Sequence, residues 1–297
     1  MKIGIIKERK SPPDRRVVLS PQKCKELLLE FTELVIKVES SDARFFTDED
    51  YKKEGIEVVD NVSDCDVLLG VKEVPIASLI PNKKYFFFSH TIKKQSYNRD
   101  LLVAILLKNI ELYDHETIIN EEGVRLVACG RYAGIVGAYN GFRSYGLKFN
   151  LFNLPKAAVL HDQVMLIDEL RKIKLPNIKI VLTGKGRVSN GAKEMLDGMQ
   201  MREVTVGEFL TQTFDEPVYV QIDVLDYNKR EDGQVINELD FFKNPEEYHS
   251  NFMRFANVAD IYIACHFYGT GSPYIFTRDD AKSKGFNIKV VADISCD

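Results

Sequence analysis

Short runs of apolar and β-branched residues alternate with segments of helical periodicity along the first half of the chain. The apolar runs predict strands at 2–6, 34–38, 67–71, 85–88 and 110–113. The periodic segments predict helices at 21–31, 48–55 and 97–109, the first with Ser20 as its N-cap. Strands separated by helices of this length need crossover connections, so we expect a mainly parallel sheet.

A second strand–helix series follows in the other half of the chain. We predict strands at 178–183, 203–206, 219–224, 261–265 and 288–294, and helices at 161–173 and 189–199. The segment 130–141 between the two series has a helical pattern rich in small residues, which favours a tightly packed interdomain helix over a ligand-contacting one. We therefore expect two Rossmann-like α/β domains, 1–128 and 129–297.

Composition narrows the class of protein. Of 297 residues, 45% are hydrophobic and 28% are charged, as in ordinary globular enzymes. The net charge of −4 leaves no basic surplus, so we expect no nucleic-acid partner. The five cysteines form no CxxC pair, which indicates neither a metal site nor a disulfide framework. No signal-peptide pattern and no apolar run of about 20 residues occurs, so we expect a cytoplasmic protein without membrane contact.

A glycine-rich loop follows the predicted strand 178–183 and opens the next predicted helix. In this context it is typical of a dinucleotide-binding turn: Gly184 allows the tight turn, and Gly186 lets the backbone approach a pyrophosphate. Ser189 stands where a third glycine is usual. The alternative is a plain strand–helix turn. The predicted cofactor-binding residues of the loop are Gly184, Lys185, Gly186, Arg187, Val188 and Ser189.

Charged residues near this loop bear on which cofactor it would bind. Glu208 lies 24 positions after Gly184, in the region where an acidic residue bonds the adenosine ribose of NAD. Lys185 and Arg187 could instead hold the 2′-phosphate of NADP. The sequence leaves NAD and NADP both open, and ordinary solvated charges are the third possibility.

Polar residues stand where several predicted strands of the first half end. Each of these residues could simply be a polar residue at the point where the chain leaves the core. Together, however, they could form a catalytic site. A lysine and a histidine can share acid–base work near neutral pH, and two arginines can hold carboxylates. Arg125 is expected to open a strand running to residue 128. The residues are Arg16, Lys72, Glu73, His90, Asp114, His115, Glu116 and Arg125.

These motifs resemble a known superfamily. The opening Lys-Glu-Arg at 7–9, with Arg-Arg-Val-Val-Leu-Ser-Pro at 15–21, is similar to the N-terminal signature of alanine dehydrogenases, transhydrogenase α-type domains and saccharopine dehydrogenases. Phe-Ser-His-Thr-Ile-Lys-Lys-Gln at 88–95, Leu-Tyr-Asp-His-Glu at 112–116 and the glycine loop resemble the lysine–ketoglutarate reductase half of aminoadipic semialdehyde synthase. The match continues through 245–255, 275–281 and 291–295.

The resemblance implies a function and roles for residues. That family condenses lysine with 2-oxoglutarate and reduces the imine to saccharopine with a nicotinamide hydride, in an active-site cleft between two domains. Lys72 and His90 would then be the acid–base pair. By the same resemblance, Arg16, Glu73, Glu116 and Arg125 would bind the substrates, and Asp293 or Asp297 would lie near the nicotinamide. The partners expected are an amino acid and a 2-oxo acid, and no oligomeric state is indicated.

Two other functions fit the same residues. One is an alanine-dehydrogenase-like amino-acid dehydrogenase, against which the later motifs argue. The other is a catalytically silent NAD(P)-binding protein, against which the presence of Lys72, His90, Arg16 and Arg125 argues. In the superfamily the chain returns to the first domain after the strand at 288–294. Because the sequence stops at Asp297, we expect the return segment to be absent here.

Overall fold

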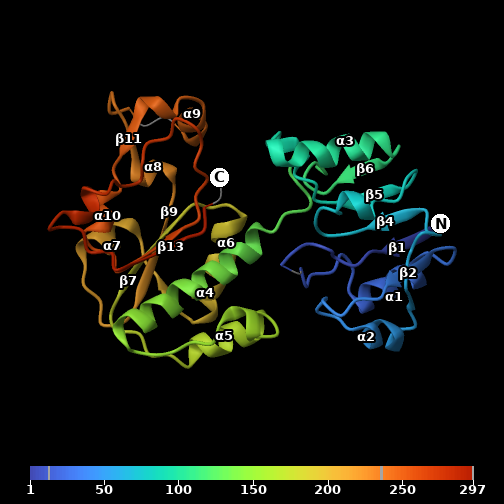
Figure 1. Cartoon of the computed structure of the whole chain (residues 1–297). Helices are drawn as coiled ribbons and strands as arrows, with labels where there is room; N and C mark the ends of the chain where they lie inside the picture. The colour runs from blue at the N-terminus through green and yellow to red at the C-terminus, as the bar shows by residue number, and fades with distance from the viewer. Residues whose placement is uncertain (13, 235–236, 296–297) are drawn as a thin grey trace. The chain divides into compact units, whose positions relative to one another are not determined.

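The computed structural model describes residues 1–12, 14–234 and 237–295. It divides into two compact units, Met1–Ala128 and Cys129–Asp297, which are described separately (Figure 1). Each unit contains its own parallel sheet, so the expected α/β class with mainly parallel sheets is confirmed. Among the described residues, no helix has the length and apolar composition that a membrane-spanning segment needs.

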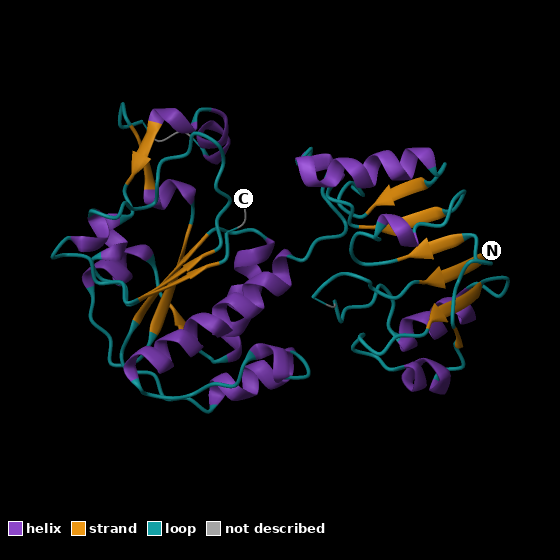
Figure 2. Ribbon diagram, viewed as in Figure 1, coloured by secondary structure: helices purple, strands orange, loops and turns teal. Residues whose placement is uncertain are grey.

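The first unit is built on six parallel strands (Figure 2). In sheet order they are β3 (Glu57–Val59), β2 (Val35–Glu39), β1 (Lys2–Ile5), β4 (Val67–Leu69), β5 (Lys84–Phe87) and β6 (Glu111–Asp114). The helices are α1 (Pro21–Glu30), α2 (Asp48–Lys53) and α3 (Arg99–Leu107). The strand order changes direction between β1 and β4, and ligands of such sheets bind at the carboxyl ends of the strands beside that point.

Local signals explain most of these elements. Ser20 accepts a hydrogen bond from the Lys23 amide and starts α1, with Pro21 in the first turn. The sequence prediction missed the three-residue strand β3 at the edge of the sheet. The strand expected to open at Arg125 was wrong: Arg125 forms a single antiparallel bridge with Ile119, since no neighbouring strand is there to extend the pairing.

The second unit has a five-stranded parallel sheet and a small antiparallel ribbon. In sheet order the strands are β13 (Val290–Asp293), β12 (Ile261–Ala264), β7 (Lys179–Thr183), β9 (Val218–Ile222) and β8 (Arg202–Glu203). The ribbon pairs β10 (Asn228–Arg230) with β11 (Tyr248–Ser250). The helices are α4 (Gly130–Phe149), α5 (Gln163–Arg171), α6 (Arg187–Gly198), α7 (Val206–Thr211), α8 (Val224–Tyr227), α9 (Glu238–Lys243) and α10 (Met253–Ala256).

The strand that follows α6 differs from the prediction. It was expected at 203–206, but β8 ends at Glu203 and a capping box between Thr205 and Glu208 starts α7 immediately afterwards. The two-residue β8 lies at the edge of the sheet, and β9 takes the place beside β7. This order decides which acidic residue can reach the glycine loop.

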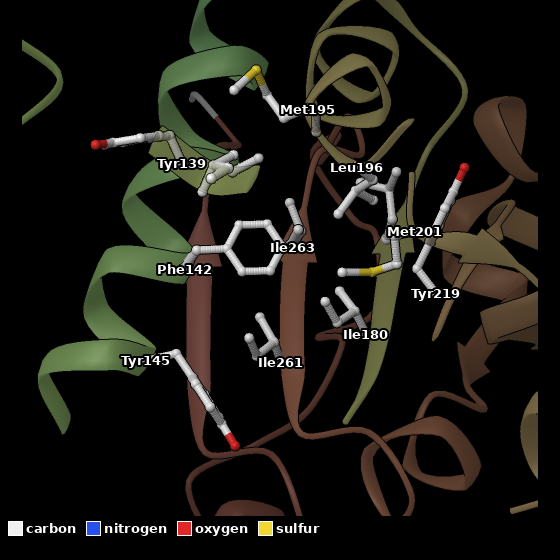
Figure 3. Packing of buried hydrophobic residues seen from close by; sticks show 14 of the residues in the cluster. Tyr139, Phe142, Tyr145, Ile180, Met195, Leu196, Met201, Tyr219, Ile261 and Ile263 are labelled. Carbon is white, nitrogen blue, oxygen red and sulfur yellow. The ribbon is translucent and has the colours of Figure 1, made fainter. Parts of the chain in front are cut away.

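Helix α4 packs on the second sheet and on α6 through its small residues. Phe142 and Tyr145 of α4 lie in one buried cluster with Ile261 and Ile263 of β12 (Figure 3). A Cβ on Gly134 would lie 1.9 Å from the Val188 carbonyl oxygen of α6. The predicted tight packing of the small-residue segment is therefore confirmed, but these contacts lie within the second unit and not between domains.

Candidate active site and cofactor pocket

Lys72, His90 and Glu116 form a continuous hydrogen-bonded row in the first unit. The Lys72 Nζ lies 3.3 Å from His90 Nε2, and His90 Nδ1 lies 3.0 Å from Glu116 Oε2. The Glu116 side chain is 9% exposed, whereas that of His90 is 24% exposed. A carboxylate beside Nδ1 favours the proton on that nitrogen, which leaves Nε2 to accept from the lysine ammonium.

The fold brings this row together from three adjacent strands. Lys72 follows β4, His90 follows β5 and Glu116 follows β6, and these strands are neighbours in the sheet. His90 lies in the left-handed region with φ 58°, and Asn98 Nδ2 donates to its carbonyl at 3.3 Å. Asp114 accepts from the Glu116 amide at 2.8 Å and so fixes the start of that loop.

The main chain at Lys72 is held by a residue that the sequence prediction did not select. Glu8 accepts from the Val71 amide at 2.7 Å through one oxygen and from the Lys72 amide at 2.9 Å through the other. The Lys72 ammonium also lies 5.9 Å from the centre of the Phe88 ring, within cation–π range. The lysine is thus positioned at its backbone and at its charged end.

Glu73 has a buried carboxylate oxygen that lies at the same end of the sheet. Its Oε1 accepts from Lys10 Nζ at 2.8 Å, and its Oε2 is buried without a hydrogen-bond partner. Burial raises the pKa of Glu73, but the bond from Lys10 and the nearby His90 outweigh it and leave the pKa below its ordinary value. An ionised, unpaired carboxylate oxygen is suited to bind an ammonium group.

The two predicted arginines have different positions. Arg125 Nη1 lies 3.9 Å from Glu116 Oε1, so Arg125 joins the row at its carboxylate end. Arg16 is instead bonded to Asp14, with Nε 3.0 Å from Oδ1. That bond holds the pKa of Asp14 below its ordinary value, and the Arg16 charge also acts on Glu8. We call Lys72, His90, Glu116, Glu73, Lys10 and Arg125 the polar cluster.

The second unit contains a cavity of about 460 Å³ at the carboxyl ends of its strands. It is lined by the glycine loop after β7, by Asp223 and Val224 after β9, by Cys265–Phe267 after β12 and by Ile294 and Ser295 after β13. Of the predicted cofactor residues, Gly184, Lys185, Gly186, Arg187 and Val188 line it. The volume is in the range of small-molecule and cofactor sites.

The geometry of the loop fits a dinucleotide. Gly184 has φ 94°, and a Cβ there would lie 2.9 Å from the Cys265 carbonyl oxygen, so only glycine suits the position. A Cβ on Gly186 would meet nothing within 4 Å, which leaves its backbone open to the cavity. Gly186 is the N-cap of α6, a helix of 12 residues, and glycine has no side chain that could cap it. The first backbone amides of α6 are therefore available to bind an anion.

Ser189 stabilises the turn of the glycine loop. Its Oγ donates to the Gly184 carbonyl at 2.6 Å, and Gln221 Nε2 donates to both of these oxygens at 2.9 Å. The side chain is fully buried and does not line the cavity. The predicted cofactor contact is therefore wrong for the Ser189 side chain, because its hydroxyl is used to close the turn.

The acidic residue beside the glycine loop is Asp223, not Glu208. Glu208 bonds the Thr205 amide at 2.9 Å in the capping box of α7, and this bond lowers the pKa of Glu208. The prediction for Glu208 was wrong because β8 is not the neighbour of β7. Asp223, at the end of β9, lines the cavity with Glu238 of α9.

Further pocket residues lie beyond β12 and β13. His266 lines the cavity with Nδ1 3.0 Å from Thr183 Oγ1, and burial lowers the pKa of His266 so that a neutral imidazole faces the pocket at pH 7. Asp293 is exposed and accepts from Ser295 Oγ at 2.6 Å, next to the lining residues Ile294 and Ser295. Asp297 lies outside the described residues.

Comparison with known proteins shows which families the chain is similar to. Residues 4–136 match the family model of the alanine dehydrogenase/PNT N-terminal domain. The chain thus resembles the superfamily of alanine dehydrogenases, transhydrogenases and saccharopine dehydrogenases, as predicted. It is 31% identical over 91% of its length to mitochondrial alpha-aminoadipic semialdehyde synthase of Bos taurus. It is also 23% identical over 96% of its length to the NAD⁺, L-lysine-forming saccharopine dehydrogenase of Yarrowia lipolytica, of which it covers 72%.

A solved structure has a similar fold. The transhydrogenase of Sinorhizobium meliloti superposes with a TM-score of 0.58 at 14% identity, over 94% of this chain and 74% of that one. The chain spans about a third of the length of the aminoadipic semialdehyde synthases that it matches: 32% of the Arabidopsis thaliana protein and 31% of the bovine one.

Proposed function

We propose that this chain is an NAD(P)H-dependent oxidoreductase that joins an amino acid to a 2-oxo acid reductively, in the manner of lysine–ketoglutarate reductase. The observation that carries this proposal is the row Lys72–His90–Glu116, with contacts of 3.3 and 3.0 Å, beside an unpaired carboxylate oxygen of Glu73. The similarity to saccharopine dehydrogenase over most of the chain supports the same class of reaction.

Condensation of an amine with a ketone needs proton transfer at two steps. The amine must lose a proton before it attacks the carbonyl carbon, and the carbinolamine hydroxyl must gain one before it leaves as water. In the proposed mechanism, Lys72 and His90 exchange these protons with the substrates. Glu116 stabilises the positive charge on His90 when His90 holds the extra proton, as a carboxylate does for an imidazolium.

The remaining residues of the polar cluster bind substrate. In the proposal, Glu73 receives the ammonium group of the amino-acid substrate, and Arg125 pairs with a carboxylate. Arg16 is proposed as a second carboxylate ligand, which requires it to exchange its bond with Asp14 for one with substrate. The glycine loop and the first amides of α6 would hold the pyrophosphate of the cofactor. When bound, the nicotinamide supplies the hydride that reduces the imine.

The decisive assay follows NAD(P)H oxidation with two substrate pairs: lysine with 2-oxoglutarate, and pyruvate with ammonia. We expect turnover with the first pair. The Lys72→Met variant should lower kcat by about 10²- to 10⁴-fold, the usual contribution of a positioned acid–base group, with little change in cofactor affinity. Lys53→Met on α2, where the side chain is 74% exposed, is the matched control and should behave as the unmodified chain.

The outcomes separate the candidate functions. Turnover with pyruvate and ammonia alone would favour an alanine-dehydrogenase-like activity. Cofactor binding without turnover of either pair would favour a silent NAD(P)-binding protein. An unchanged kcat in Lys72→Met would show that the chemistry is not performed by the polar cluster.

A further inference from the structure

His266 lies directly beside the glycine loop in the cavity of the second unit. It follows β12, the neighbour of β7 in the sheet, and lines the cavity together with Gly184 and Gly186. A Cβ on Gly184 would lie only 3.1 Å from the His266 Cα, so the two segments are in close contact. His266 is therefore placed at the loop to which the proposed function assigns the pyrophosphate of the cofactor.

The two ring nitrogens of His266 have different surroundings. Nδ1 lies 3.0 Å from Thr183 Oγ1 and 3.4 Å from the Tyr262 hydroxyl. A hydroxyl can donate to a bare nitrogen and accept from a protonated one, so Nδ1 has a partner in either charge state of the ring. Among the described residues, Nε2 has no hydrogen-bond partner, and it is not closed off from solvent. Nε2 is therefore the nitrogen that can donate to a ligand in the cavity.

Among the described residues packed against the imidazole, the titratable groups are neutral near pH 7 apart from one carboxylate. The Tyr227 ring of α8 lies 5.9 Å from the imidazole, and burial raises the pKa of Tyr227 as it does that of Tyr262. Burial also raises the pKa of Cys265 to about 12. The carboxylate is Asp293 of β13, which raises the pKa of His266 by less than burial lowers it. The free protein therefore keeps the imidazole neutral at pH 7.

The rest of the cavity wall carries charges of both signs. Asp223 and Glu238 are acidic, and Lys185 Nζ lies 2.7 Å from Asp223 Oδ2. Arg187 adds a positive charge at the start of α6. A pyrophosphate at the glycine loop brings further negative charge, and a negative charge close to an imidazole favours its protonated form. Of the described lining residues, His266 is the one whose charge can change near neutral pH when the anion arrives.

We propose that His266 binds the cofactor pyrophosphate through Nε2 and takes up a proton from solvent as the anion binds. This inference rests on the proposed cofactor-binding function. In the charged ring both nitrogens carry hydrogen: Nδ1 donates to Thr183 Oγ1, and Nε2 donates to the anion. Because the complex then holds more protons than the free protein, the affinity for the cofactor rises as the pH falls toward the pKa of the free histidine.

Calorimetric titration of the full chain with NADH tests the proton uptake. Titrations in buffers of different ionisation enthalpy give the number of protons bound per NADH. We expect an uptake of up to about one proton near pH 6.5, and roughly threefold or more tighter binding at pH 6 than at pH 8. Adenosine, which has no pyrophosphate, should cause no uptake.

Variants assign the proton to one residue. His266→Gln keeps an amide donor but has no titrating ring, so it should abolish the uptake and flatten the pH dependence. His249→Gln, on a side chain of β11 that is 50% exposed, is the matched control and should keep both. The difference between the unmodified chain and His266→Gln cancels any proton bound by the nucleotide itself, so the comparison is equally valid with NADPH. If His266→Gln does not fold, histidine ¹⁵N spectra of the unmodified chain should show His266 changing from neutral to charged when NADH is added.

The outcomes separate this inference from the proposed function. Equal uptake in the unmodified chain and in folded His266→Gln, uptake of the same size with adenosine, or a His266 that stays neutral in the saturated complex overturns the inference and leaves the proposed function standing. Binding of neither NADH nor NADPH overturns both.

Discussion

Glu8 shows how much a single buried side chain contributes to this site. Its two carboxylate oxygens accept separately from the amides of Val71 and Lys72, so it fixes the backbone from which the lysine of the proposed acid–base pair extends. Burial raises the pKa of Glu8 above its ordinary value even though both amide bonds favour its ionised form. We infer that Glu8 is a positioning residue, because it acts on Lys72 through the main chain.

The variant Glu8→Gln should therefore impair turnover without removing any group of the polar cluster. The amide oxygen can accept only one of the two bonds, and its NH₂ group would face a backbone donor. We expect kcat to fall about tenfold with a KM for cofactor that changes less than twofold, and Glu8→Asp to recover part of the loss. Steady-state kinetics, with exposed Glu30→Gln as control, measures this. A rise in KM alone would contradict the positioning role.

At the scale of elements, the contact between α4 and α6 sets the position of the glycine loop. Helix α6 starts at Arg187, and α4 reaches it so closely that glycine is required on both sides: a Cβ on Gly191 would lie 1.9 Å from the Arg131 carbonyl oxygen. Arg131 also bonds Glu194 across the two helices at 2.6 Å. The start of α6 is thereby fixed against a rigid neighbour.

Gly134→Ala should destabilise the second unit. The new methyl group would meet backbone atoms of α6, which cannot rotate away, so we expect a loss of about 1–3 kcal/mol or more and a lower Tm. Gly207→Ala is the matched control, because nothing lies within 4 Å of its Cβ and alanine favours a helix by about 1 kcal/mol. Thermal unfolding followed by circular dichroism distinguishes them; equal melting temperatures would contradict the close packing.

At the scale of the whole molecule, ionised carboxylates contribute to stability in both units. The bond from Arg16 lowers the pKa of Asp14 in the first unit, and the bond from Arg131 lowers the pKa of Glu194 in the second. The unfolded chain binds protons to these groups at higher pH than the folded chain does. Their contribution is therefore present above the ordinary values of 3.8 and 4.5 and is lost as the pH falls through the lower folded values.

We accordingly expect the free energy of unfolding to decline slightly as the pH falls below 7, because the unfolded chain protonates His266 before the folded chain does. Below about pH 5 the paired carboxylates add to this loss and the decline becomes steeper. Denaturant titrations at pH 7, 6, 5, 4 and 3.5 measure the trend. Arg131→Met should flatten part of the decline, because it removes the partner that lowers the pKa of Glu194. Stability that rises on acidification would show that the paired carboxylates do not dominate the pH dependence.

The amino-acid sequence by itself determined the local and periodic features of this protein. Alternating apolar runs and helical periods defined two series of parallel strands, and Gly184, Gly186 and the charges after each strand marked the strand ends at which we propose that ligands bind. These features depend on neighbouring residues in the chain. Lys72, His90 and Glu116 were selected because each follows its own strand, and adjacent parallel strands bring such ends together.

Only the tertiary structure decided which distant groups act as pairs. The order of strands in the sheet placed Asp223 instead of Glu208 beside the glycine loop, because β9 and not the two-residue β8 pairs with β7. Packing likewise placed Glu8 at the Lys72 amide and brought Glu238 to the cavity that Asp223 lines. Strand order and side-chain contacts depend on packing over the whole unit, and no spacing along the chain encodes them locally.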